Sequence, residues 1–226
     1  MEHWQSVFQS VWDYVGAILF VLVFPVYHAI YPVVARHLPS RAAQARTQLY
    51  RHSWIRGLLE RGDLLMGVHQ ARNLTMMNSL LVSSTVILIG LTAALVPQIQ
   101  TLVDLEILDQ AGARAAFVKL TLLILILAIA CSYFMGAMRH IGHFTLVLGA
   151  DLKLVEEHDG DPVEYFSGLM DKASSRHTLG MRTFYSALPV LLWVFDTWLF
   201  VGITAFWGAK FMGFQDFLRK GNDRHA

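Results

Sequence analysis

The chain has 226 residues, a length typical of one domain or two small ones. Apolar residues make up 55% of it and charged residues 15%, against roughly 25% charged in typical soluble proteins. With 18 Lys and Arg against 17 Asp and Glu, the net charge of +1 excludes a nucleic-acid-binding protein and a disordered chain. The single cysteine, Cys131, excludes an internal disulfide framework. What remains is a membrane protein.

Four long uncharged segments predict membrane-spanning helices. A run of about 18 or more residues with few charges is typical of such a helix. The runs predict spans at about residues 14–35, 74–96, 117–138 and 183–209. We therefore expect an all-α integral membrane protein, a four-helix bundle that forms one domain over residues 1–226.

The first segment differs from a cleavable signal and from a simple anchor. No Lys or Arg precedes it, so the basic region of a signal peptide is missing. Its second half contains Pro25 and Pro32 together with Tyr27, His28 and Tyr31. These residues predict a kinked helix with a polar inner end.

The distribution of basic residues predicts the orientation. Twelve of the 18 Lys and Arg fall in the first and third connections, residues 36–73 and 139–182. The positive-inside rule therefore places these connections in the cytoplasm and both termini outside the inner cell membrane. The four basic residues of the C-terminal tail oppose this orientation.

Both cytoplasmic connections contain amphipathic sequence. Trp54, Ile55, Leu58 and Leu59 share one helical face, which predicts an interfacial helix held on anionic lipid headgroups. In the third connection, Asp161 followed by Pro162 is typical of a helix N-cap with proline at the first helical position.

The predicted cytoplasmic ends of all four spans carry His, Arg, Asn or Tyr, and in a bundle these side chains could converge. Three interpretations compete with simple anchoring at headgroups. Arginines could hold an anion, two histidines at i and i+3 with a third could bind a metal ion, and a histidine pair could, more weakly, bind haem. The arginines are Arg72, Arg139 and Arg182, the histidines are His140, His143, His69 and His28, and Asn73, Asn78, His177 and Tyr185 lie at similar depth.

Asp196 interrupts the fourth uncharged segment near its middle. In one continuous helix over residues 183–209 it would lie near the bilayer midplane, where an ionised carboxylate costs about 2.5–3.5 kcal/mol. It is therefore expected to be an ion or proton site, or a neutral carboxyl group bonded to hydroxyls.

The chain resembles a family of membrane proteins from bacteria and plants catalogued as domain of unknown function 599. The likeness rests on the strings Gln70-Ala71-Arg72-Asn73 and Gly180-Met181-Arg182-Thr183-Phe184-Tyr185, and on Tyr27-His28 and Arg139. The resemblance implies a four-span helical membrane protein and brings no reaction with it. Asp196-Thr197 stands where the family pattern has Gly-Pro.

The sequence predicts a homo-oligomeric channel or transporter that binds a small anion or metal ion at the cytoplasmic His/Arg cluster. The alternative is a non-catalytic accessory or scaffolding subunit of a larger membrane complex. No standard enzyme motif is present. The expected partners are the lipid bilayer, anionic headgroups and further copies of the chain.

Overall fold

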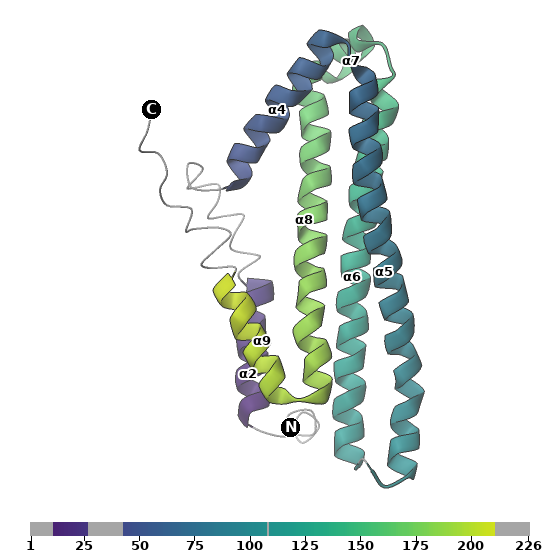
Figure 1. Cartoon of the computed structure of the whole chain (residues 1–226), viewed down its shortest axis with the longest axis vertical. Coiled ribbons are helices and arrows are strands. Elements are labelled where there is room, and N and C mark those ends of the chain that lie inside the picture. Colours follow the sequence, from purple (N-terminus) through teal and green to yellow (C-terminus); the bar gives the residue numbers. More distant parts are fainter. Residues whose placement is uncertain (1–10, 27–42, 108, 211–226) are drawn as a thin grey trace. The chain divides into compact units, whose positions relative to one another are not determined.

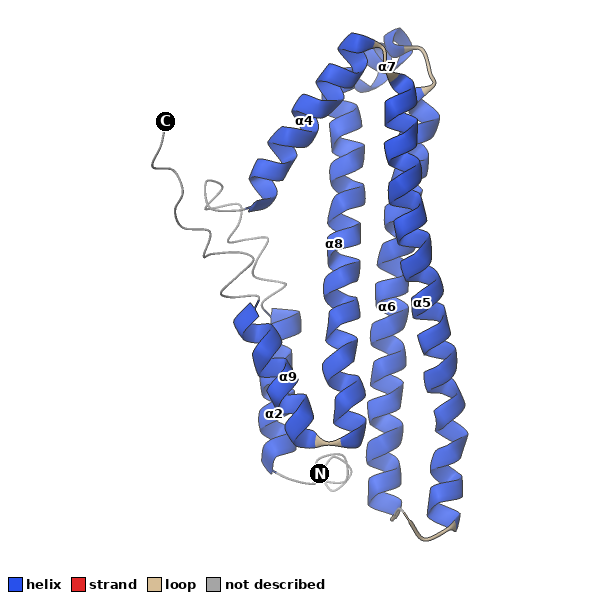
Figure 2. Cartoon of the chain, in the orientation of Figure 1, coloured by secondary structure: helices blue, strands red, loops and turns tan. Residues whose placement is uncertain are grey.

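The computed structural model describes residues 11–26, 43–107 and 109–210, and their regular structure is entirely helical (Figure 2). Three helices dominate, namely α5 (Leu64–Asp104), α6 (Gln110–Leu148) and α8 (Pro162–Phe195). Each is apolar and, at 34 to 41 residues, longer than the roughly 20 residues that cross a bilayer. The predictions of an all-α protein and of a membrane protein are confirmed at this level.

The other apolar helices among the described residues are short. The first predicted span begins as α2 (Val11–Val21) and continues as the π-helical turn η1 (Leu22–Val26), which contains Pro25. A proline removes a backbone donor from the helical ladder, which explains the change of geometry there. Residues 27–35 of that predicted span, with His28, lie outside the described residues.

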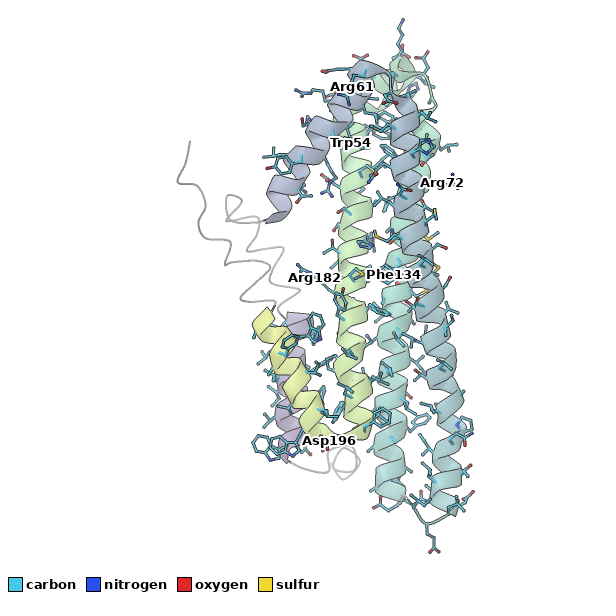
Figure 3. All side chains as sticks on the ribbon, viewed as in Figure 1. Trp54, Arg61, Arg72, Phe134, Arg182 and Asp196 are labelled. Atoms are coloured by element: carbon cyan, nitrogen blue, oxygen red, sulfur yellow. The ribbon has the colours of Figure 1, made fainter. Side chains whose placement is uncertain are left out.

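A continuous fourth helix over residues 183–209 is wrong. Helix α8 ends at Phe195 and α9 (Thr197–Lys210) begins after one non-helical residue, Asp196. Figure 3 shows Asp196 in the turn between the two helices. Its Oδ1 accepts a hydrogen bond from Leu199 N at 3.0 Å, which is the N-cap contact to the third helical residue. The chain therefore reverses direction where the sequence predicts a mid-membrane position.

Contacts divide the chain into two compact units, each built from segments far apart in sequence. Unit 1 comprises residues 1–43, 89–127 and 183–226, and unit 2 comprises residues 44–88 and 128–182. Helices α5, α6 and α8 contribute to both units.

In unit 2, α4 (Ala43–Arg61) packs on parts of α5, α6 and α8. Its Ile55 and Leu58 are fully buried with Phe144 and Phe166. The turn between α4 and α5 lets α4 fold back against the other helices. In this turn Gly62 has φ +65°, and Asp63 N donates to Leu58 O at 3.2 Å. That is the Schellman ending of a helix, which glycine accommodates without strain.

Aspartate side chains cap the N-termini of α7 and α8. Asp151 caps α7 (Leu152–Asp159), and Asp161 Oδ1 accepts from Val163 N at 3.0 Å at the start of α8. The predicted cap at Asp161, with Pro162 as the first helical residue, is confirmed.

In unit 1, α2 and α9 lie side by side (Figure 1). Trp12 is 4.5 Å from Trp198 between ring centroids, and Gly208 approaches Val23 two to three turns later, so the helices run parallel. Trp193 stacks on Phe200 at 4.5 Å across the turn at Asp196. A second apolar cluster joins α6 and α8 around Leu127 and Val190.

Candidate ligand-binding cavity

Unit 2 contains a partly open cavity of about 520 Å³, lined by residues of α4, α5, α6 and α8. This volume lies within the range of about 300–1,000 Å³ that is common for small-molecule sites. Every residue that lines it belongs to unit 2: Thr47, Tyr50, Arg51, Trp54, Gln70, Leu74, Asn78, Ile141, Met170, Ala173, Ser174 and His177.

Helical spacing explains which residues line the cavity. The four lining residues of α4 are at 47, 50, 51 and 54, and those of α8 are at 170, 173, 174 and 177. Both sets follow the i, i+3, i+4, i+7 pattern of one helical face. The three residues of α5, at 70, 74 and 78, are four apart and also form one stripe.

Arg51 is the cationic group of the cavity lining. Its Nη2 lies 2.7 Å from Oδ1 of Asp171 on α8, an ion pair in which the two side chains are 19% and 30% exposed. The Nε atom of Arg51 is buried and has no hydrogen-bond acceptor. Since a guanidinium group has five N–H donors, Asp171 fixes this side chain without using its full capacity.

Asn78 and His177 form the inner polar contact of the cavity. Asn78 is 1% exposed, and its Oδ1 lies 3.0 Å from His177 Nδ1. Because an amide oxygen only accepts, Nδ1 of His177 is the donor. Asn78 Nδ2 in turn donates to Leu74 O at 2.8 Å, which fixes the orientation of the amide.

The rest of the lining is apolar. Trp54, Leu74, Ile141 and Met170 surround the polar groups. Ile141 is 2% exposed and Met170 5%, so this side of the cavity belongs to the core of unit 2. An apolar enclosure with a few directed polar groups is typical of sites for small organic ligands.

A second polar cluster lies in unit 1. Asp13 of α2 is 2% exposed, and its Oδ1 accepts from Trp193 Nε1 at 2.7 Å and from Thr197 Oγ1 at 2.6 Å. Lys119 of α6 donates to Trp193 O at 3.0 Å and lies 4.8 Å from the centroid of the Trp193 ring. The cluster joins four helices around one carboxylate.

The family model described as "Protein of unknown function, DUF599" matches residues 15–217. The chain belongs to this family. Comparisons with curated proteins and with solved structures gave no match. All of the residues that line the cavity fall within the matched region, whereas Asp13 precedes it.

The site residues predicted for this DUF599 protein that the structure describes, which are all of them except His28, do not line the cavity. His69, Arg72 and Asn73 are exposed on α5, where Figure 3 labels Arg72, and Arg139 is exposed on α6. Arg72 is two residues from Gln70 and from Leu74, which turns it about 200° around the helix from the lining face.

The remaining predicted residues have other partners. His143 Nε2 lies 3.1 Å from Tyr165 Oη, and the Tyr185 ring stacks on Trp207 at 4.9 Å. Arg182 and His140 are partly exposed on α8 and α6. Within the described ranges, no three His, Cys, Asp or Glu side chains are grouped to hold a metal ion, and the metal set with His69, His140 and His143 stays a prediction.

The sequence placed Asn78 and His177 at similar depth in the membrane, which is consistent with the hydrogen bond between them. It missed Arg51 as a binding residue, together with Asp13 and Lys119. The available signal for Arg51 was its position three residues before Trp54 on α4, a face that the apolar pattern marks as buried.

Proposed function

We propose that this DUF599 membrane protein binds a small organic anion in the cavity of unit 2 and carries it across the membrane. The observation that supports the proposal is the Arg51 guanidinium in the lining of a cavity of about 520 Å³, paired with only one carboxylate, that of Asp171. A ligand carboxylate would accept charge-assisted hydrogen bonds from the remaining N–H donors of this group. Tyr50 and Ser174 also line the cavity and offer hydroxyl groups to the same ligand.

The apolar lining favours an organic anion over an inorganic one. A bare ion would leave most of this volume and the faces of Trp54, Leu74 and Met170 without a partner. A ligand with an apolar body would cover them and gain about 25 cal/mol for each Å² of apolar surface removed from water. The predicted metal set of His69, His140 and His143 does not line this cavity and is a separate prediction.

The exposed apolar face of α5 bears on the accessory-subunit hypothesis. In the most apolar 18-residue window of α5, only 11% of the residues are buried, against 39% for α6. Large side chains such as Leu80, Ile87 and Leu91 are more than 60% exposed there. This face suits lipid, a second copy of the chain or another subunit, so it does not favour accessory function over transport.

Saturation-transfer NMR with benzoate tests the binding step on the protein in nanodiscs. Benzoate joins a carboxylate to an apolar ring, and benzyl alcohol is its uncharged counterpart. We expect a benzoate signal that is lost in Arg51→Gln and kept in Arg56→Gln, an exposed arginine on the same helix. Ser174→Leu, which fills the cavity, should also abolish the signal.

Two outcomes would contradict the binding proposal. One is an equal benzoate signal in Arg51→Gln and in the native chain. The other is a benzyl alcohol signal as strong as that of benzoate, because it would remove the role of the arginine. Uptake of labelled benzoate into proteoliposomes then tests transport, and binding without uptake would support the accessory role instead.

A further inference from the structure

A second feature of unit 2 lies on the other side of α8, where this helix packs on α6. Tyr165, Lys172 and Arg176 are separated by seven and four residues, so they fall within about 40° of one another on the helical wheel. The cavity-lining residues of α8, at 170, 173, 174 and 177, centre on a different face, about 130° away on the helical wheel. Helix α8 therefore presents two distinct polar surfaces.

Arg176 lies directly on α6. Its guanidinium carbon is 5.8 Å from the centroid of the Tyr133 ring. A Cβ added at Gly136 would lie 3.7 Å from Arg176 Cδ, an ordinary van der Waals distance, so the arginine stem lies beside α6 at this residue. The cation is thereby held against the surface of α6.

The same surface of α6 continues with basic residues. His140 follows one turn after Gly136, and His143 bonds Tyr165 of α8 at 3.1 Å. As residue numbers rise along α6 they fall along α8, so Lys172 is level with His140. We call this surface the α6–α8 basic surface, and its members are Arg139, His140, His143, Lys172 and Arg176.

Among the described residues, positive charge gathers around His140. All the charged groups that act on His140 are basic, namely Arg176, Lys172, Arg139 and His143. Asp171, the carboxylate next to Lys172 in sequence, is paired with Arg51 instead. Mutual repulsion among these groups is relieved when an anion binds between them.

We propose that the α6–α8 basic surface binds a phosphate group, as carried by an anionic lipid headgroup or by free phosphate. Two helices supply Lys and Arg donors of the kind that bind phosphate oxygens. Arg139 directly follows the uncharged run 120–138, and basic residues at the end of an apolar span reach headgroup depth. This site is separate from the organic-anion cavity and does not depend on it.

Thermal unfolding of the purified full chain in a neutral detergent tests the site. The probes are dioctanoyl phosphatidylglycerol, dioctanoyl phosphatidylcholine and sodium phosphate at equal ionic strength. We expect phosphatidylglycerol to raise the unfolding midpoint of the native chain by several degrees. The increase should be lost in Lys172→Gln/Arg176→Gln and kept in Arg114→Gln/Lys153→Gln, which removes two exposed charges elsewhere.

The probes distinguish the two sources of phosphate. Stabilisation by phosphatidylglycerol alone assigns the α6–α8 basic surface to a lipid headgroup. Equal stabilisation by sodium phosphate assigns it to free phosphate. The proposal is overturned if neither probe raises the midpoint, if phosphatidylcholine acts equally, or if both double variants lose the shift equally. If Lys172→Gln/Arg176→Gln fails to fold, Lys172→Gln alone replaces it, because that side chain is exposed.

Discussion

Buried polar side chains mark the places where single residues hold the helices of each unit together. Asn78 is 1% exposed and Asp13 2% exposed, and each is hydrogen-bonded to a residue far away in sequence. A buried polar group that loses its partner costs about 1–3 kcal/mol. Such positions are therefore more sensitive to substitution than the exposed charges around them.

Asp13 offers the sharpest test at this scale. Asp13→Leu removes the acceptor of Trp193 Nε1 and Thr197 Oγ1 and also the negative charge near Lys119. We expect it to lower the free energy of unfolding by about 2–4 kcal/mol, because hydrogen bonds to charged groups contribute about 1.5–3 kcal/mol each. Unfolding by SDS titration in mixed micelles, followed by circular dichroism, measures this change.

Asp13→Asn serves as the matched variant, since its amide oxygen still accepts both hydrogen bonds. We expect it to be less destabilised than Asp13→Leu, and we expect Glu157→Leu, at an exposed position on α7, to unfold like the native chain. Equal stability of Asp13→Leu and the native chain would show that the cluster does not fasten α2 to its neighbours.

The sequence located polar residues by depth but not by direction around each helix. The uncharged runs place Arg72 and Asn78 near one end of the second span, and both do lie on α5. Only Asn78 shares the face of Gln70 and Leu74 that lines the cavity. A change of 100° per residue decides this, and the partners of each face depend on packing that a single sequence does not display.

At the scale of whole elements, length and hydropathy predicted the long helices but did not predict the break at Asp196. Hydropathy measures how apolar a segment is, and residues 183–209 are apolar throughout except at Asp196. The helix nevertheless ends at Phe195, and Asp196 begins a new one. Asp is a strong N-cap residue, so the residue interpreted as a buried charge also carries the signal for a helix start.

The capping role of Asp196 leads to a prediction about α9. Asp196→Ala removes the acceptor for Leu199 N and should lower the free energy of unfolding by about 0.5–2 kcal/mol. Asp196→Asn keeps an equivalent acceptor and should match the native chain. SDS titration of the three proteins measures the difference.

The same pair of variants tests the proposed ion or proton site at Asp196. A site that needs the negative charge would lose its function in Asp196→Asn even though the fold is retained. Native-like ion flux and stability in Asp196→Asn, together with reduced stability in Asp196→Ala, would leave capping as the role of this residue.

Helix α4 shows how an element can be predicted correctly while its partners are not. The shared apolar face of Trp54, Ile55 and Leu58 indicated an amphipathic helix, and α4 is helical from Ala43 to Arg61. Its apolar face packs on the core of unit 2 with Phe144 and Phe166. An apolar stripe records that a face is buried, but lipid and protein both satisfy that requirement.

For the whole molecule, the long apolar helices establish a membrane protein, and the side on which each connection lies remains a prediction. Connections one and three carry twelve of the 18 basic residues, which places them in the cytoplasm by the positive-inside rule. Helix α6 is the clearest element with which to test it. Its 39 residues are preceded by Asp109 and followed, through a short turn, by α7.

Single-cysteine labelling in intact cells measures the sidedness directly. Cys131 is buried and is the only cysteine, so Cys131→Ala provides a cysteine-free background. Asp109→Cys and Glu157→Cys then place one thiol at an exposed position beyond each end of α6. We expect a membrane-impermeant maleimide to label Asp109→Cys in intact cells and Glu157→Cys only after permeabilisation.

The pattern of labelling separates orientation from membrane crossing. The reverse pattern would contradict the predicted orientation and favour the influence of the four basic residues in the C-terminal tail. Labelling of both positions in intact cells would mean that α6 does not separate two compartments, although it is long and apolar enough to cross a membrane. The predicted pattern would place the α6–α8 basic surface at the cytoplasmic leaflet, where anionic lipids are concentrated.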